Sequence, residues 1–159
     1  MLLHEEISDK ILKSFYTVYN KLGYGFLEKV YENALILELR NAGLNCSKQV
    51  PIEVYYEGVS VGNYFADILV EDKIILELKA GDGTLIEEHE LQLINYLKAT
   101  DKEVGILLFF GKKPVFKRKI FTNDNKKSVK ISFISVISVP SGYYHRPRTS
   151  AAWRRYYYI

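Results

Sequence analysis

The chain has 159 residues, a length that suits one domain with its own hydrophobic core. Its 48% hydrophobic and 26% charged residues and its net charge of +3 are typical of a soluble globular protein and exclude a largely disordered or fibrous chain. The single cysteine excludes an internal disulfide and a structural zinc site of the usual kind, and it fits a reducing cytoplasm. The sequence contains no run of about 18 uncharged apolar residues, so no membrane span is predicted.

Two helices are predicted at the beginning of the chain. Between residues 7 and 22, apolar side chains recur every three or four positions, which is the spacing of one helical stripe. Gly23 and Gly25 interrupt this pattern, and a second helical pattern follows over residues 27–39. Gly43 suits the left-handed residue after a helix, so we expect the second helix to end just before it.

Three strands in series are predicted next, over residues 50–56, 59–70 and 73–80. The segments are rich in β-branched and aromatic residues, and the pairs Glu57-Gly58 and Glu71-Asp72 between them are typical of tight turns. Short turns join antiparallel neighbours. The segment therefore predicts an antiparallel meander.

A crossover is predicted after the meander. Thr84 is a candidate N-cap for a helix over residues 85–99, and residues 104–110 form a continuous apolar run typical of a strand buried on both faces. If the strands before and after this helix belong to one sheet, they should be parallel with a right-handed connection. The fold class is therefore α/β, with a mixed central β-sheet flanked by helices.

The end of the chain changes in character. A strand over residues 115–121, a polar loop over 122–128 and a last strand over 129–139 are expected to complete one domain over residues 1–139. Residues 140–159 are rich in Arg, Tyr, Ser and Pro and have no helical or strand period, so we interpret them as a basic, aromatic-rich tail.

Three charged residues of the meander predict a cation site. Glu77 and Lys79 are two apart on one strand and share a face, while the turn before them brings Asp67 of the preceding strand back toward Glu77. Two carboxylates amid apolar residues are costly unless paired with each other, a substrate or a metal ion. Mg²⁺ prefers such oxygen ligands, and an ammonium group beside it can position an attacking water.

These residues carry a resemblance to a known family. Asp67 followed by Glu77-Leu78-Lys79 resembles the D…(D/E)xK signature of the PD-(D/E)XK nuclease superfamily, and Gln92 to Tyr96 is similar to the Q-x-x-x-Y motif of its exonuclease-like branch. The resemblance implies a restriction-endonuclease-like core and metal-dependent cleavage of phosphodiester bonds. Gln92 would then steady the site, whereas Tyr96 is either a substrate contact or a core aromatic residue.

A further motif narrows the resemblance. Gly25 to Tyr31 matches the G-x-x-E-x-x-Y pattern of the GxxExxY family within this superfamily, and the agreement spans about residues 7–120. In nucleases of this fold a glutamate of the first helix often completes the metal site, and Glu28 is the matching position. The chain departs from the pattern at Phe109-Phe110-Gly111, where an asparagine usually precedes the last two residues.

The resemblance implies a hydrolase that cuts nucleic acid, DNA rather than RNA, with Mg²⁺ or Mn²⁺ as cofactor. The implied catalytic residues are Glu28, Asp67, Glu77, Lys79 and Gln92, of which Asp67, Glu77 and Glu28 would bind the metal. The alternative function is a catalytically silent module of the same fold that binds nucleic acid or a protein partner. A third alternative, a structural protein in which Glu77 and Lys79 form an ion pair, also stays open.

The charge distribution also indicates a polyanionic partner. Residues 102–159 contain 13 Lys and Arg against 2 Asp and Glu, whereas residues 1–101 contain 9 against 17, although a solvated tail gives the same asymmetry. Candidate nucleic-acid contacts are His89, Tyr96, Lys112, Lys113, Lys117, Arg118 and Lys119. No membrane partner is expected, and a homodimer is one state that the sequence leaves open.

Overall fold

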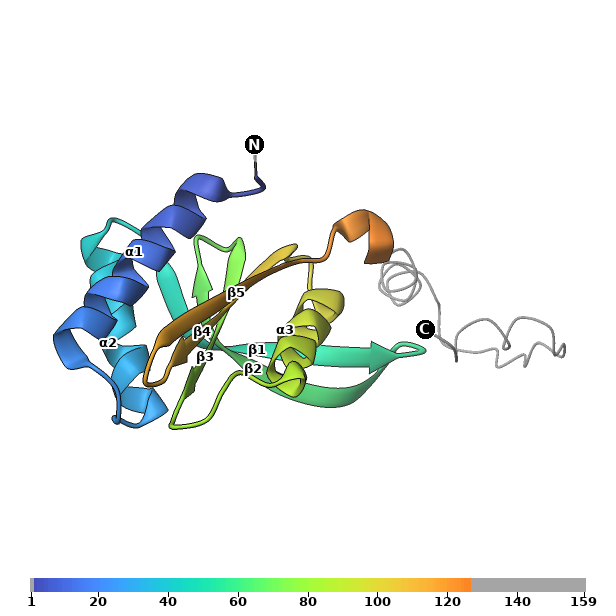
Figure 1. The fold of residues 1–159 in the computed structure, drawn as a ribbon. Coiled ribbons are helices and arrows are strands. Elements are labelled where there is room, and N and C mark those ends of the chain that lie inside the picture. The colour runs from blue at the N-terminus through green and yellow to red at the C-terminus, as the bar shows by residue number, and fades with distance from the viewer. Residues whose placement is uncertain (1, 127–159) are drawn as a thin grey trace, which may run out of the picture.

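The computed structural model describes residues 2–126. Its elements in chain order are α1 (Glu5–Leu22), α2 (Glu28–Asn41), β1 (Cys46–Tyr56), β2 (Val59–Val70), β3 (Ile74–Ala80), α3 (Glu87–Ala99), β4 (Val104–Phe110), β5 (Pro114–Ile120) and a short 3₁₀ helix, η1 (Asn123–Lys126). Figure 1 shows two helical layers with a twisted sheet between them. None of the helices in residues 2–126 is long and apolar enough to cross a membrane.

One mixed sheet contains all five strands, in the order β1-β2-β3-β4-β5. Neighbouring strands are antiparallel except for β3 and β4, which pair in parallel across the α3 crossover. The prediction of an α/β fold with a mixed central sheet is therefore confirmed, as is the parallel pairing that the crossover predicted. The tight turns form because Glu57, Gly58, Glu71 and Asp72 all have positive φ angles near 50–80°, the conformation of a type I′ hairpin turn.

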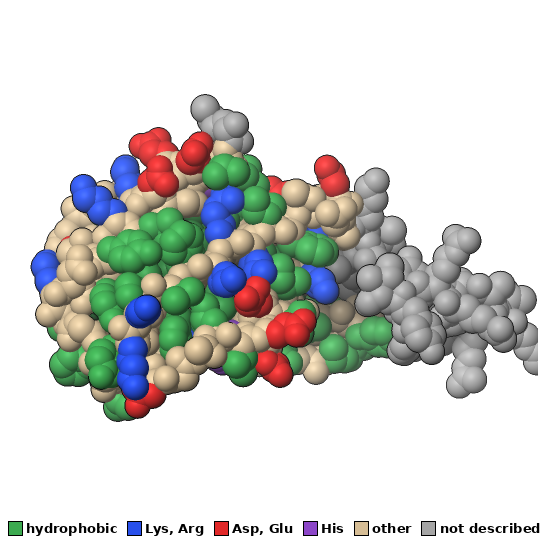
Figure 2. Space-filling model, in the orientation of Figure 1, with side chains coloured by type: hydrophobic (Ala, Val, Ile, Leu, Met, Phe, Trp, Pro, Cys, Tyr) green, Lys and Arg blue, Asp and Glu red, His purple; other side chains and the backbone are tan. Residues whose placement is uncertain are grey.

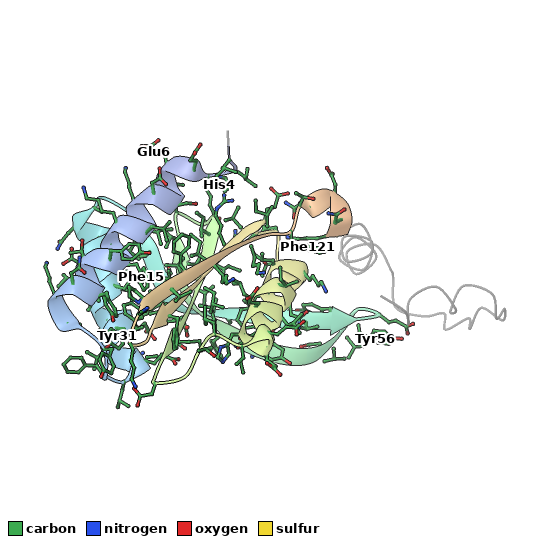
Figure 3. The ribbon with its side chains drawn as sticks, viewed as in Figure 1. His4, Glu6, Phe15, Tyr31, Tyr56 and Phe121 are labelled. Atoms are coloured by element: carbon green, nitrogen blue, oxygen red, sulfur yellow. The ribbon has the colours of Figure 1, made fainter. Side chains whose placement is uncertain are left out.

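α1 and α2 cover one face of the sheet with an almost wholly apolar core (Figure 1). α1 buries Ile11, Phe15 and Val18, which follow the three-to-four spacing of its stripe. Figure 3 shows Phe15 directed from α1 toward the sheet, where its ring meets Phe110 of β4 edge to face at a centroid distance of 4.8 Å. This layer is the larger of the two cores.

α3 covers the other face and makes a smaller core. Leu93 and Leu97 of the helix pack against Ile75 of β3 and Leu107 of β4. The close approach of α3 to the sheet depends on Gly105, where an added Cβ would lie 2.6 Å from a methyl group of Leu93. Because β3 is buried on both faces, its odd-numbered side chains must fit beneath α3 whatever their charge.

Several elements begin or end one or two residues from the predicted bounds, and a 3₁₀ helix, η1, lies within the predicted polar loop over residues 122–128. The third helix and the first strand differ for reasons that the structure shows. The third helix begins at Glu87 after Ile86, without a side-chain cap, so the prediction that Thr84 caps a helix from residue 85 is wrong. β1 begins at Cys46, four residues before the predicted strand, because a pairing of Cys46 with Val70 extends the antiparallel ladder. The predicted strand over residues 129–139 and the tail over 140–159 lie outside the described residues.

Candidate active site

β3 places two charged residues on the face beneath α3. Leu76 and Leu78 point into the core under α1 and α2, so the alternation of the strand turns Glu77 and Lys79 toward α3. Glu77 is only 2% exposed. The shared face that the sequence predicted for Glu77 and Lys79 is confirmed by an ion pair of 3.0 Å between Lys79 Nζ and Glu77 Oε1.

Asp67 joins them where β2 and β3 stop pairing. The ladder between these strands runs from Val70 paired with Ile74 to Ile68 paired with Leu76, and it ends one position before Asp67 would meet Glu77. Beyond that point the Asp67 side chain replaces a backbone acceptor, because Oδ2 accepts a hydrogen bond of 2.7 Å from the backbone N–H of Leu78. The predicted return of Asp67 toward Glu77 is therefore confirmed.

α3 holds Glu77 from above. The Gln92 side-chain amide donates hydrogen bonds to Glu77 Oε1 at 3.0 Å and to the Tyr96 hydroxyl at 2.7 Å. Residues 92 and 96 are one helical turn apart, which places both side chains on the side of α3 that faces Glu77. The site thus consists of a carboxylate on β2, a carboxylate and an ammonium on β3, and an amide and a phenol on α3.

One oxygen of Glu77 has no partner in residues 2–126. Oε1 accepts bonds from both Lys79 and Gln92, whereas Oε2 is buried and has no hydrogen-bond donor. A buried acceptor without a donor costs about 1–3 kcal/mol and calls for an explanation such as an ion. This oxygen is the part of the site that is open to a cation.

Burial and the charges of neighbouring acids raise the pKa of both carboxyl groups. Burial is the main cause for Glu77, and the negative charge of Asp67 adds to it, so the pKa of Glu77 rises to about 7 despite the nearby Lys79. Burial also raises the pKa of Asp67, although the Leu78 N–H and Lys79 act in the opposite direction. Two neighbouring acids with raised pKa values on one face of a sheet are typical of a functional site.

Lys79 responds in the sense expected of a lysine beside acids. Burial alone would lower its pKa, but the negative charge of Glu77 and its hydrogen bond outweigh burial, so the pKa of Lys79 is raised. Lys79 is therefore protonated at neutral pH. The site holds one fixed positive charge beside two acids with raised pKa values, of which Glu77 has a pKa of about 7.

Glu28 approaches the same end of the sheet from the other helical layer. Figure 1 shows the beginning of α2 near the end of β3. Glu28 is the first residue of α2, and its charge acts on Asp67, Glu77 and Lys79. Its side chain is exposed. The structure thus brings Glu28 within electrostatic range of the site but not into a compact ligand cluster.

The loop before Glu28 is fixed by the other two residues of its motif. Gly25 has a φ of 108°, a conformation that favours glycine. The Tyr31 hydroxyl donates a hydrogen bond of 2.7 Å to Gly23 O and accepts one of 3.3 Å from Phe26 N–H. The Tyr31 ring is fully buried and stacks on Phe110 at 4.2 Å. Glycine and tyrosine therefore set where α2 begins and where Glu28 lies.

The site offers oxygen ligands of the kind that a hard divalent cation prefers, but it offers only two carboxylates. Asp67 and Glu77 offer carboxylate oxygens, and Glu77 Oε2 is unpartnered. Within residues 2–126, no three His, Cys, Asp or Glu side chains lie close enough together to hold a metal ion. Mg²⁺ is commonly bound through one or two carboxylates together with waters and substrate phosphates, so two acids fit this ion.

The sequence did not single out Glu32, which the structure places beside the site. Glu32 is 5% exposed, accepts a hydrogen bond of 3.1 Å from the Gln49 amide and pairs with Lys29 at 2.9 Å. Its charge contributes to the raised pKa of Asp67. Glu32 lies one turn after Glu28, so the four-residue spacing of two acids was the available signal, but spacing alone could not show that Glu32 is buried.

Gln49 has an unusual backbone conformation opposite Asp67. It lies between Lys48 and Val50, whose partners on β2 flank Asp67, and its φ is 50°. Such an angle is uncommon for a non-glycine residue and is found where the surroundings impose it. The hydrogen bond from Gln49 to Glu32 joins this strained position to α2.

The remaining predicted contacts divide into two groups. Arg118 donates hydrogen bonds to Leu3 O and to Ser8 Oγ, and Lys119 forms an ion pair with Glu90 of α3, so these two side chains also connect β5 to the helices. Lys112, Lys113 and Lys117 are exposed. On the face drawn in Figure 2, basic side chains are interspersed with acidic and apolar ones over β5 and α3.

His89 lies on α3 one turn before Gln92. Its side chain is half-buried, and Nδ1 is buried with no hydrogen-bond partner in residues 2–126. The position agrees with the predicted helical side, because residues three apart share one face. A contact between His89 and a nucleic acid stays a prediction.

Comparisons with known proteins show the family of the chain. A family model described as the PD-(D/E)XK nuclease superfamily matches residues 5–120. This match covers every helix and strand from α1 to β5 and all four of Glu28, Asp67, Glu77 and Lys79. The chain therefore belongs to the PD-(D/E)XK nuclease superfamily. Among curated proteins, none matches the chain.

A solved structure shows the same architecture. The structure titled "Crystal structure of SSO0001" superposes with a TM-score of 0.50 and 17% sequence identity, covering 91% of this chain and 82% of that chain. At this identity the likeness concerns the fold alone. The restriction-endonuclease-like core that the sequence predicted is consistent with the matched superfamily and with the mixed five-stranded sheet.

Proposed function

We propose that the protein is a metal-dependent nuclease that hydrolyses phosphodiester bonds, with DNA as its substrate in preference to RNA. The observation that carries the proposal is the convergence of Asp67, Glu77 and Lys79 at one point under α3, with Glu77 Oε2 left without a donor. The superfamily consists generally of nucleases, which supports hydrolysis as the reaction.

Asp67 and Glu77 would hold Mg²⁺ or Mn²⁺, and Glu28 would contact the ion through water. The chemistry that such an ion supplies when bound is neutralisation of the phosphate charge during substitution at phosphorus. The exposure of Glu28 and the absence of a three-acid cluster in residues 2–126 favour a water-mediated role for Glu28 over direct ligation.

Lys79 would act on the reacting groups directly. Its ammonium is held beside Glu77 with only a fifth of its side chain exposed, and it can donate a hydrogen bond to an attacking water or to a phosphate oxygen. A fixed positive charge near developing negative charge lowers the barrier without reorganisation. Gln92 would keep the Glu77 carboxylate oriented, and Tyr96 would keep Gln92 in place.

We further propose that the chain belongs to the GxxExxY family within the superfamily. Both the sequence pattern and the structure support this proposal. Gly25 has a positive φ, the Tyr31 hydroxyl forms hydrogen bonds with the loop over residues 23–26, and Glu28 is the first residue of α2. Each residue of the pattern thus has a separate task. Glu28 is the only one of the three that reaches the site electrostatically.

The basic residues would contribute affinity for the substrate rather than chemistry. Lys112, Lys113 and Lys117 are exposed and form no ion pair within residues 2–126, so they would neutralise backbone phosphates. Arg118 and Lys119 already bind protein groups and would contribute less. Binding that depends on such contacts weakens steeply with salt.

Cleavage assays with matched variants test the proposal. Full-length protein is incubated with labelled single- and double-stranded DNA and with RNA, in EDTA, Mg²⁺ or Mn²⁺. Asp67→Asn and Lys79→Ala remove site charges, whereas Asp9→Asn and Lys13→Ala change exposed residues of α1. The proposal expects metal-dependent cleavage that only the first pair of variants abolishes. Equal activity in all variants would contradict it, and binding without cleavage would favour the catalytically silent module.

A further inference from the structure

A cavity borders the candidate active site. It has a volume of about 610 Å³ and lies between the β1–β2 hairpin and α3. Figure 1 shows α3 lying across β1 and β2, with the hairpin extending beyond the helix. The volume falls in the range of roughly 300–1,000 Å³ that is typical of small-molecule sites.

A chain of hydrogen bonds connects the cavity to the Glu77 carboxylate. Gln92 and Tyr96 both line the cavity. Gln92 donates a hydrogen bond to Glu77 and another to the Tyr96 hydroxyl. A group bound in the cavity would therefore lie next to the site at which a phosphodiester is proposed to be cut. The two spaces can accept adjacent parts of one ligand.

Three tyrosines contribute to the lining of the cavity. Tyr64 of β2 faces Tyr96 of α3 at a centroid distance of 5.9 Å with the planes tilted by 48°, and Tyr55 of β1 completes the lining on the hairpin side. Gly62 leaves room for the Tyr64 ring, since an added Cβ would lie 3.2 Å from its Cε2. Tyr64 is half exposed, so its ring presents a surface on which a flat ligand can stack.

The charges of the lining decide which part of a nucleic acid can enter. Glu53 and Glu88 contribute carboxylates and Lys98 contributes one ammonium, so the cavity carries a net negative charge that disfavours a phosphate. A nucleobase is flat, uncharged and able to stack on tyrosine, and its amino and imino groups can bond to the side chain of Asn95 or to these acids.

We infer that the cavity between the β1–β2 hairpin and α3 binds one unstacked nucleobase of the substrate, next to the scissile phosphate. The inference rests on the proposed nuclease function and adds a preference for substrates with an unpaired base. A base inside a duplex cannot reach the cavity without leaving its stack, so single-stranded or distorted DNA should bind more tightly than a regular duplex.

Fluorescence of 2-aminopurine tests the inference without requiring cleavage. A single-stranded DNA oligonucleotide with one 2-aminopurine is titrated with full-length protein carrying Asp67→Asn, which keeps the acceptor for the Leu78 N–H but lowers the site charge. Stacking on Tyr64 should quench the fluorescence. Adding Tyr64→Ala should remove the quench and weaken binding about tenfold, whereas Tyr64→Phe should retain both.

Tyr56 provides the matched control. It lies at the tip of the same hairpin, is 57% exposed and does not line the cavity (Figure 3). Tyr56→Ala should therefore leave the quench and the affinity unchanged. Failure of the oligonucleotide to bind, binding without quenching, or equal effects of Tyr64→Ala and Tyr56→Ala would each overturn the inference.

Parallel cleavage reactions separate this inference from the proposed function. Quenching that depends on Tyr64, together with no cleavage by the wild-type protein in any metal, supports the base site and contradicts the nuclease. Cleavage that depends on metal and on Lys79, together with no quenching, contradicts the base site alone. Circular dichroism of each variant shows whether the fold is retained.

Discussion

The two faces of β3 carry side chains of different kinds. Toward α1 and α2 the strand presents Leu76 and Leu78, which are fully buried in the larger apolar core. Toward α3 it presents Glu77 and Lys79, of which Glu77 is buried with one oxygen unpartnered. One strand thus contributes stability through one face and candidate chemistry through the other.

The contrast between the two faces shows how this fold can accommodate a buried carboxyl group that is unfavourable for stability. Burying a charged carboxyl group is unfavourable, and Glu77 is kept in place by Lys79 and Gln92 and by a strand that apolar contacts anchor from behind. We expect substitution of Lys79 on the α3 face to change activity, and substitution of Leu76 or Leu78 on the α1 and α2 face to change stability.

The largest expected effect is on activity, at Lys79. Lys79→Ala should lower kcat by about 10³-fold, because it removes a preorganised charge next to the reacting phosphate. The fold should persist, since Leu76 and Leu78 on the other face are untouched. Single-turnover cleavage kinetics at saturating protein measure the effect, with Lys13→Ala as control. A loss below tenfold would contradict a direct role for Lys79.

The next effect is on stability, at the neighbouring residue. Leu78→Ala should lower the free energy of unfolding by about 3 kcal/mol, because it leaves a cavity in the core under α1 and α2. Urea unfolding followed by circular dichroism measures this change. Equal stability of the Leu78→Ala and Lys79→Ala variants would contradict the claim that one face of β3 contributes to stability and the other to activity.

Substitution of Glu77 should raise the free energy of unfolding, whereas Leu78→Ala lowers it, and the size of the increase should depend on pH. Its pKa is about 7 in the folded protein and 4.5 without the fold, so its burial destabilises the protein above pH 7 and not below pH 4.5. Glu77→Gln should therefore raise the free energy of unfolding by about 2 kcal/mol at pH 8, and the gain should shrink toward pH 5.

Urea unfolding of both proteins in EDTA at several pH values tests this sign. A glutamine at position 77 retains an acceptor for Lys79 and Gln92, so the comparison isolates the charge of the carboxylate. Asp9→Asn, on the exposed surface of α1, is the control and should show no such dependence. A gain from Glu77→Gln that is the same at pH 5 and pH 8 would contradict the burial of a titrating Glu77.

The smallest effect is expected at Tyr31, on the α1 and α2 face. Tyr31→Phe keeps the ring stacked on Phe110 but removes the hydroxyl that binds Gly23 O, and it should cost about 1 kcal/mol of stability. Cleavage should fall only a few-fold, since Glu28 acts at a distance. Thermal unfolding and cleavage rates of the same preparation measure both. An unchanged melting temperature would show that the loop over residues 23–26 is fixed by other contacts.

The sequence was sufficient for the parts of the site that follow from strand geometry. Alternation placed Glu77 and Lys79 on one face, and the turn at Glu71-Asp72 returned Asp67 toward them. The position of Gln92 on the side of α3 that faces Glu77 followed from helical spacing once the motif had been recognised. Local periodicity and one short turn carried this information.

The parts that depend on packing between distant elements could not be predicted. Burial of Glu32 depends on α2 meeting Gln49 of β1, and the cavity beside Tyr64 depends on how far α3 lies from the hairpin. The start of the third helix was also misplaced, because Thr84 is a good cap by residue type but the helix begins only after Ile86. Such features are set by tertiary contacts rather than by local pattern.

The most direct test of the central claim is a calorimetric titration of the full-length protein with Mn²⁺ at pH 8, compared with Asp67→Asn, Glu77→Gln and the Asp9→Asn control. If Asp67 and Glu77 jointly bind a cation, the wild-type protein and the control should bind one Mn²⁺, and each site variant should bind at least tenfold more weakly. The wild-type affinity should also rise as the pH passes through about 7, where Glu77 loses its proton. Equal affinity in all four proteins would contradict the claim.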